Sequence, residues 1–242
     1  MGSSPEMIRK PGKPIIQEDI KAEEGKRLLE QGAKALGISL SVHQLDQFME
    51  YLILLRKWNR HINLTGLRSY REIIIKHFLD SLTPLPYLPE KAKILDLGSG
   101  AGFPGLPIKI VRPDQPVTLI EASAKKISFL KEVIRRLNLR PVSVYQTYLG
   151  KGSPSLSKSN QFEIIITRAV GKLDELLAGV YPYLVEGGNL LLMKGRRGPE
   201  EVAVLKTEIR ERGFRLETPI VLTLPFLEQE RWLIFLKKDK GR

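Results

Sequence analysis

The chain has 242 residues, 42% of them hydrophobic and 27% charged, which is the composition of an ordinary globular protein with a core. It has no cysteine, which excludes disulfides, thiolate metal sites and a cysteine nucleophile, and which fits a reducing cytoplasm. No apolar run approaches the ~18 residues needed to span a bilayer, and no signal-peptide pattern opens the chain. The three histidines stand singly, so we expect no metal site.

Positive charge is concentrated in the carboxy-terminal part of the chain. The formal net charge is +12. Residues 1–90 contribute 13 basic and 11 acidic side chains, whereas residues 91–242 contribute 26 and 16, a surplus of 10 positive charges. Such a region is typical of proteins that bind a polyanion, although a basic surface kept for solubility would give the same count.

The first 90 residues predict a tail and a helical region. Residues 1–18 contain three prolines and no apolar periodicity, and we expect them to be disordered. Residues 19–90 are expected to form the helical region, in which Ser41 and Gln44 make a capping box. The predicted helices cover residues 18–36, about 42–58 and 70–82.

From residue 91 apolar strands alternate with helices. The predicted strands are residues 93–97, 117–121, 142–145, 162–167, 189–194, 214–224 and 231–237. The predicted helices are residues 104–111, 124–137, 173–184 and 200–212. Alternation of this kind predicts a parallel sheet covered on both faces, and the last two strands, which have no helix between them, predict an antiparallel terminal hairpin. The expected fold is therefore α/β and Rossmann-like, with a seven-stranded, mostly parallel sheet.

A glycine-rich turn in residues 94–105 joins the first strand of this region to its first helix. Gly98, Gly100 and Gly102 can adopt positive φ and let backbone amides approach a ligand, and Pro104 is expected at the first helical position. A strand, a tight glycine turn and a helix N-terminus in this order form a binding site for a nucleotide-like cofactor.

Two carboxylates indicate which cofactor this turn favours. Asp96 would repel the pyrophosphate of a dinucleotide and attract the sulfonium and amino groups of S-adenosylmethionine. Glu121, about twenty residues further on, stands where an acid accepts the ribose hydroxyls. The sequence therefore favours a class I methyltransferase whose S-adenosylmethionine-binding domain is residues 91–242, and an NAD(P)-dependent oxidoreductase is the alternative.

Five short stretches carry a resemblance to a known family. They are residues 63–65, 76–81, 95–105, 167–169 and 192–195. Together they resemble the glucose-inhibited division protein B family, bacterial small-subunit rRNA guanine-N7 methyltransferases also called methyltransferase G. The resemblance implies a cytoplasmic enzyme that uses S-adenosylmethionine to methylate N7 of a guanine in the decoding-region loop of 16S rRNA, on naked rRNA or on the small subunit. Nothing in the sequence suggests an obligate dimer, so we expect a monomer with no membrane partner.

The resemblance also implies cofactor contacts. It places Gly98 and Phe103 on the cofactor loop, Arg168 at its edge, and two further contacts at Thr147 and Tyr148. Members of the family often have a small residue followed by a carboxylate at these last two positions. Backbone groups of Thr147 and Tyr148, or stacking by Tyr148, would have to serve here.

The chemistry of guanine N7 frames the remaining roles. N7 has a lone pair and no proton to lose, so attack on the methyl group needs positioning and no general base. Arg168 is predicted to be the catalytic residue, donating to guanine O6 or to a phosphate, with a surface salt bridge as the alternative. Lys194, Arg196 and Arg197 are predicted to bind RNA phosphates, or else to form a solvated loop.

Some alternatives stay open at this point. His77 and Asp80, three residues apart, either bridge the helical region to the cofactor site or form a hydrogen-bonded pair, and we favour the pair. Asn63 either caps the turn that follows it or reaches the site. A non-catalytic RNA-binding assembly factor is a further alternative, which the intact glycine turn and Glu121 argue against.

Overall fold

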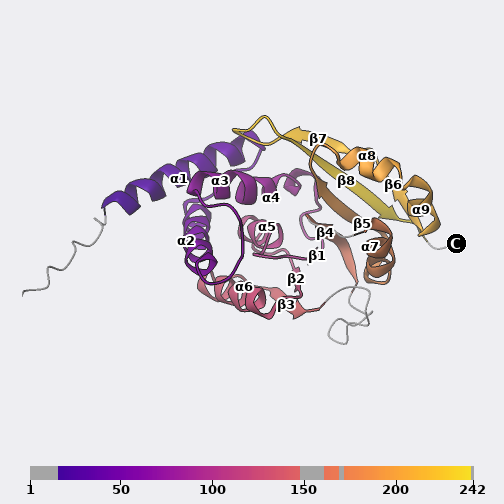
Figure 1. Ribbon diagram of the computed structural model, residues 1–242, viewed down its shortest axis with the longest axis horizontal. Helices are drawn as coiled ribbons and strands as arrows, with labels where there is room; N and C mark the ends of the chain where they lie inside the picture. Colours follow the sequence, from indigo (N-terminus) through magenta and orange to yellow (C-terminus); the bar gives the residue numbers. More distant parts are fainter. Residues whose placement is uncertain (1–15, 148–160, 169–171, 241–242) are drawn as a thin grey trace, which may run out of the picture.

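The computed structural model describes residues 16–147, 161–168 and 172–240. Figure 1 shows a twisted central sheet with helices on both faces, and the amino-terminal helices lie along one of these two faces. Residues 1–15 of the expected tail lie outside the described part, and the first helix begins at Ile16, earlier than predicted. Within the described ranges, no helix has both the length and the apolar character needed to cross a bilayer.

The amino-terminal region is helical, as predicted. Its elements are α1 (Ile16–Ala35), α2 (Val42–Asn59), α3 (Tyr70–Ile73), η1 (Ile74–Leu79), α4 (Asp80–Leu82) and η2 (Leu85–Tyr87). The capping box is confirmed, since the Ser41 hydroxyl accepts from Gln44 N–H and the Gln44 side chain accepts from Ser41 N–H. The predicted helix over residues 70–82 is continuous, but η1 is wound as a π-helix, and such widened turns often occur at functional sites.

The sheet contains eight strands in the described residues. They are β1 (Ile94–Leu97), β2 (Val117–Glu121), β3 (Val142–Gln146), β4 (Phe162–Thr167), β5 (Leu184–Lys194), β6 (Phe214–Leu216), β7 (Ile220–Thr223) and β8 (Glu230–Lys238). The order is β3-β2-β1-β4-β5-β8-β6, with β1 to β5 parallel and β8 antiparallel to its neighbours. The fold class is thus confirmed.

The predicted strand over residues 214–224 is divided into β6 and β7, which both pair with β8. Phe214 lies opposite Lys238 and Ile220 opposite Leu233, so the register shifts by one residue between the two segments. Pro219 stands in the interruption and has no N–H to donate to a ladder. The two segments together therefore occupy the single place in the sheet that the seven-stranded prediction assigned to one strand.

Helices connect the parallel strands, and several of their boundaries differ from the predicted ones. The elements are α5 (Gly105–Val111), α6 (Ala124–Arg136), α7 (Leu173–Val180), η3 (Tyr181–Tyr183), α8 (Gly198–Ala203) and α9 (Lys206–Glu211). The helix predicted over 173–184 ends at Val180, because Pro182 follows in a 3-10 turn. Strand β5 already begins at Leu184, and the helix predicted over 200–212 is broken into α8 and α9.

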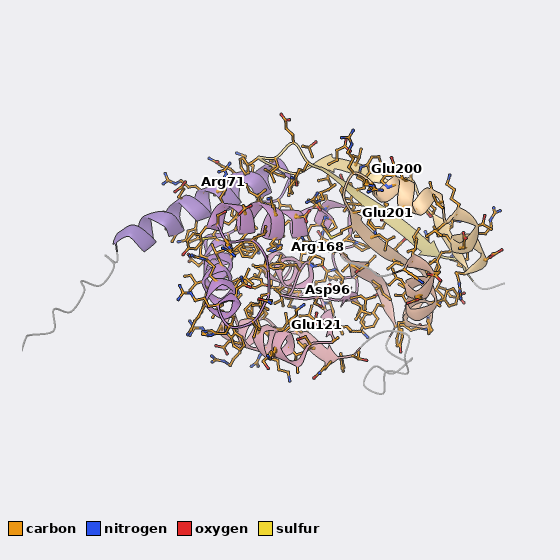
Figure 2. The ribbon with its side chains drawn as sticks, viewed as in Figure 1. Arg71, Asp96, Glu121, Arg168, Glu200 and Glu201 are labelled. Carbon is orange, nitrogen blue, oxygen red and sulfur yellow. The ribbon has the colours of Figure 1, made fainter. Side chains whose placement is uncertain are left out.

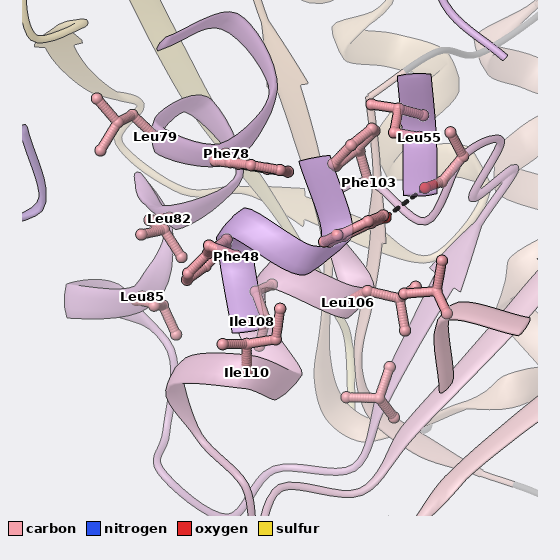
Figure 3. Packing of buried hydrophobic residues seen from close by; sticks show 14 of the residues in the cluster. Phe48, Leu55, Phe78, Leu79, Leu82, Leu85, Phe103, Leu106, Ile108 and Ile110 are labelled. Carbon is pink, nitrogen blue, oxygen red and sulfur yellow. Dashed lines mark hydrogen bonds between the residues drawn. The ribbon is translucent and has the colours of Figure 1, made fainter. Parts of the chain in front are cut away.

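Two hydrophobic clusters cover the two faces of the sheet. One cluster joins Ile94 and Ile164 to side chains of α2, η1, α5 and α6, and the other joins the alternate residues Leu95 and Ile165 to α7, α8 and α9. Figure 3 shows Phe48, Phe78 and other members of the first cluster packed together. Because successive side chains of a strand point to opposite faces, these two sets define the two layers of core. The amino-terminal helices therefore pack directly against the sheet domain.

Candidate cofactor and substrate site

The site lies where the order of the strands reverses. Chain order runs from β1 to β3 in one direction and from β4 to β5 in the other, so a crevice is expected outside the carboxyl ends of β1 and β4. Asp96, Glu121 and Arg168 come from β1, from β2 and from the end of β4, and Figure 2 shows them in the middle of the molecule. The pKa of Asp96 responds to the charges of both Glu121 and Arg168, so the three predicted residues share one electrostatic environment.

The glycine turn after β1 has the geometry that the sequence predicts. Gly98, Gly100 and Gly102 have φ of 72°, 58° and 93°, a region that other residues rarely adopt. A Cβ atom on Gly102 would stand 2.5 Å from the hydroxyl oxygen of Tyr51, so that position also leaves no room for a side chain. One detail differs from the prediction: Pro104 immediately precedes α5, which begins at Gly105.

Asp96 is buried beneath this turn, with 1% of its surface exposed. Its Oδ2 accepts a hydrogen bond from Gly105 N–H at 2.8 Å, whereas Oδ1 is buried and has no partner among the described residues. Burial raises the pKa of Asp96 to about 7. An unpartnered oxygen on a desolvated carboxylate favours a cationic ligand group, because a charge-assisted hydrogen bond would restore the lost solvation. The amino group of S-adenosylmethionine fits this requirement.

Glu121 closes the other side of the turn. It is 7% exposed, and its oxygens accept from Gly100 N–H and from Ser123 N–H, each at 2.9 Å. A carboxylate offers about four acceptor positions, so each oxygen can accept one further hydrogen bond from a ligand. Thr147 follows β3, is half-buried and donates its N–H to the Glu121 carbonyl at 3.2 Å. The neighbouring prediction, Tyr148, lies outside the described residues.

Phe103 connects the turn to the amino-terminal helices. Its ring is 7% exposed and stacks between Tyr51 of α2, at a centroid distance of 5.5 Å, and His77 of η1, at 4.5 Å. The Tyr51 hydroxyl also donates a hydrogen bond to the Ala101 carbonyl within the turn. The sequence had no signal for Tyr51 beyond its place on a helix, yet its contacts show that α2 shapes the glycine turn.

Arg168 stands directly after β4 and is turned toward the helical region. Its guanidinium donates to the Lys76 carbonyl at 3.1 Å, contacts the Ser81 hydroxyl at 3.5 Å and forms an ion pair with Asp80 at 3.1 Å. The side chain is 22% exposed, and its guanidinium carbon lies 5.9 Å from the centre of the Phe103 ring. The guanidinium of Arg168 is partly buried and has three partners, so it is not the ordinary surface salt bridge that was the alternative.

The predicted hydrogen-bonded pair of His77 and Asp80 is wrong. His77 Nε2 lies 2.7 Å from the Thr65 hydroxyl, while Asp80 binds Arg168 and Arg231. Burial, and secondarily the charge of Arg168, lowers the pKa of His77 to about 3, so the imidazole is neutral at physiological pH. His77 links the helical region to the glycine turn by stacking on Phe103, and Asp80 links that region to the sheet through its two arginine partners.

The turn over residues 60–66 is held by a residue that the sequence analysis missed. Asn59 accepts from the backbone N–H groups of Leu64 and Thr65, and its amide donates to the Thr65 carbonyl. Asn63, which was considered for this capping role, is exposed. An Asn at the end of a helix is the signal that could have pointed to Asn59.

The three predicted RNA-binding residues lie at the end of β5 and in the turn after it. Lys194 forms an ion pair with Glu201 at 2.8 Å and is 24% exposed. Arg196 and Arg197 are exposed in the turn before α8, the helix on which Figure 2 labels Glu200 and Glu201. The structure thus brings the predicted residues Asp96, Glu121 and Arg168 together. Of the three predicted RNA-binding side chains, it leaves those of Arg196 and Arg197 exposed to solvent.

The strand order, the glycine turn and the two flanking carboxylates define a class I S-adenosylmethionine-dependent methyltransferase. Solved structures share this fold: a methyltransferase from Pyrococcus furiosus, with a TM-score of 0.56 and 15% identity, covers 79% of this chain and 98% of its own. An S-adenosylmethionine-dependent methyltransferase from Aquifex aeolicus has a TM-score of 0.53 and 18% identity, covering 68% and 92%.

Sequence comparison identifies the family. Residues 44–230 match the family model described as rRNA small subunit methyltransferase G, and the chain belongs to that family. A ribosomal RNA small subunit methyltransferase G from Lachnoclostridium phytofermentans is 39% identical, covering 87% of this chain and 88% of its own. One of the same name from Geotalea uraniireducens is 37% identical, covering 89% and 98%. The interpretation as an NAD(P)-dependent oxidoreductase is therefore excluded.

Proposed function

We propose that this protein transfers the methyl group of S-adenosylmethionine to N7 of a guanine in the decoding-region loop of 16S rRNA. Family membership supports an rRNA substrate in the small ribosomal subunit. The observation that carries the choice of base is the Arg168 guanidinium beside the cofactor turn, since arginine donors match the O6 and N7 edge of guanine.

The residues of the site account for the reaction without a general base. When bound, S-adenosylmethionine supplies an electrophilic methyl group on a cationic sulfur. Asp96 Oδ1 would hold its amino group, and Glu121 would hold its ribose hydroxyls. Arg168 would orient the base through O6 and so align the N7 lone pair with that methyl group. N7 carries no proton, so positioning and exclusion of water supply the catalysis, which agrees with the neutral, buried His77.

The cofactor contacts in this proposal include backbone groups as well as carboxylates. They comprise Asp96, Gly98, Gly100, Gly102, Phe103, Glu121, Thr147, Tyr148 and Arg168. Phe103 is nearly buried between two rings, so we assign its contribution to shaping the turn. Arg168 is assigned to both the cofactor and the guanine, because it lies at the edge of the cofactor turn, where the two would meet.

The RNA phosphates are assigned to the turn after β5. Arg196 and Arg197 are exposed there and can pair with phosphates directly, whereas Lys194 must exchange its partner Glu201 for a phosphate. We propose that the enzyme acts as a monomer. Because ribosomal subunits are found in the cytoplasm, we propose that the enzyme acts there.

Methyl transfer and mapping of the modified base test this proposal. Labelled S-adenosylmethionine is incubated with the protein and with 16S rRNA that lacks the modification, either naked or within the small subunit. We expect label in one guanine of the decoding region, and chain cleavage at that guanine after reduction and aniline treatment, which is specific for N7-methylguanine. Label in another base would contradict the proposal, and RNA binding without transfer would support a non-catalytic assembly factor.

A further inference from the structure

Asp80 is a buried carboxylate of the helical region that contacts the arginine of the site. Its side chain is 4% exposed, and each of its oxygens binds a different guanidinium. Arg231 Nε, near the start of β8, lies 2.6 Å from Oδ1, and Arg168 Nη2 lies 3.1 Å from Oδ2. One carboxylate therefore links the helical region to β4 and to β8.

Among the described residues, the hydrogen-bond and ion-pair partners of the Arg168 guanidinium lie on one short segment, residues 76–81. Besides Asp80, these partners are the Lys76 carbonyl and the Ser81 hydroxyl. A guanidinium presents its N–H donors in one rigid plane, so bonds on one side also fix the direction of the donors on the other. The amino-terminal helical segment thus sets the orientation of an arginine that the sheet carries.

We propose that Asp80 is a positioning residue for methyl transfer, which fixes the Arg168 guanidinium in the orientation that binds the guanine. This inference rests on the proposed function, since it deepens the role of the same site. Of the three groups, only Asp80 is charged, and its carboxylate forms an ion pair with the guanidinium at 3.1 Å, which attracts the cation more strongly than a neutral acceptor does. Positioning errors of about 1 Å can cost about a hundredfold in rate, so a loosened Arg168 should be visible in the chemical step.

A purely structural role predicts a different pattern. Asp80 also neutralises Arg231, and breaking a buried ion pair on one side destabilises a fold whatever the site does. Replacing both partners of such a pair by neutral residues removes that penalty. The variant Asp80→Asn combined with Arg231→Met therefore restores the stability lost at the Arg231 pair, without restoring the carboxylate that holds Arg168.

The experiment compares Asp80→Asn, Arg231→Met and the double variant in the full chain. The readouts are the thermal midpoint, the dissociation constant of S-adenosylhomocysteine and the first-turnover rate of methyl transfer to rRNA. For Asp80→Asn we expect the first-turnover rate to fall at least about tenfold, whereas the cofactor affinity should stay within about threefold of the wild type. Arg231→Met should lower the midpoint and keep the rate within about threefold. The double variant should regain the part of the thermal midpoint that is lost at the Arg231 pair, and its first-turnover rate should stay low.

Two results would overturn the proposal: a wild-type rate in Asp80→Asn, or a double variant that regains rate and midpoint together. If Asp80→Asn is too unstable to purify, the double variant and Arg231→Met make the comparison on their own. Failure of the proposed function is a separate outcome, because it shows as wild-type protein that methylates another atom. The same variants are then compared on that reaction.

Discussion

The glycine turn after β1 and the turn after β5 both lie at the carboxyl edge of the sheet, but their charged groups have opposite surroundings. Asp96 and Glu121, on the cofactor side, are 1% and 7% exposed and accept hydrogen bonds from backbone amides. Arg196 and Arg197, on the proposed RNA side, are exposed. The cofactor side is organised by the fold itself, whereas the RNA side offers charges to a partner. Substitutions should therefore have large effects on the first side and small, salt-dependent effects on the second.

The largest change is expected from Glu121→Gln. One oxygen becomes an NH2 group that cannot accept from Gly100 or Ser123, and the ribose hydroxyls lose a charged acceptor. Hydrogen bonds to charged groups contribute about 1.5–3 kcal/mol each, so we expect about a hundredfold weaker binding of S-adenosylhomocysteine by calorimetry. Glu211→Gln, on the exposed end of α9, is the matched control. A loss below about threefold would show that Glu121 does not bind the ribose.

Asp96 predicts a dependence of cofactor affinity on pH. Its pKa of about 7 means that the free protein holds a proton on this carboxyl at lower pH. A cationic ligand requires the carboxylate and lowers its pKa, so affinity is full above pH 7 and is lost as the pH falls through it. Between pH 7.5 and 5.5 we expect S-adenosylmethionine to bind about tenfold more weakly, and Asp96→Asn to remove this dependence. A wild-type affinity that is flat over this range would contradict the role of Asp96.

Tyr51→Phe tests whether the helical region shapes the cofactor turn. The variant keeps the ring that stacks on Phe103 and removes the hydroxyl that donates to the Ala101 carbonyl. One such bond contributes about 1 kcal/mol, so the dissociation constant of S-adenosylmethionine should rise about fivefold. Tyr87→Phe, at an exposed position, is the control. Equal affinities in the two variants would confine the cofactor site to the sheet domain.

The smallest change is expected on the RNA side, from Arg196→Ala combined with Arg197→Ala. Each phosphate contact on a single strand contributes about 0.7 to the slope of log affinity against log salt, so the slope should fall by about 1.4. At physiological salt the RNA affinity should decrease about threefold, with cofactor affinity unchanged. Lys206→Ala, on the exposed surface of α9, controls for lost charge. An unaltered slope of log affinity against log salt would show that residues other than Arg196 and Arg197 bind the phosphates.

The same contrast separates what the sequence could predict from what it could not. The cofactor turn depends on spacing within residues 94–121, and Asp96, the glycines and Glu121 take their expected places. The surroundings of Arg168 are made by Lys76 and Ser81, 92 and 87 positions away. No periodicity links positions so far apart.

The helical region shows why a local spacing can also mislead. A separation of three on an α-helix places His77 and Asp80 on one face, but this segment is wound as a π-helix, whose wider turn changes which residues are neighbours. Long-range partners then outcompete the local pair: Thr65 binds His77, and Arg231, 151 positions from Asp80, binds that carboxylate.

The most direct test of the account is Arg168→Ala, followed by two measurements on one preparation: the dissociation constant of S-adenosylhomocysteine and the first-turnover rate on rRNA. Arg168 lies beside Phe103 of the glycine turn and is held by Asp80 of the helical region. Because its proposed role is to orient the guanine, we expect the rate to fall about a hundredfold, much further than the cofactor affinity. Full methyl transfer with unchanged cofactor affinity would contradict it.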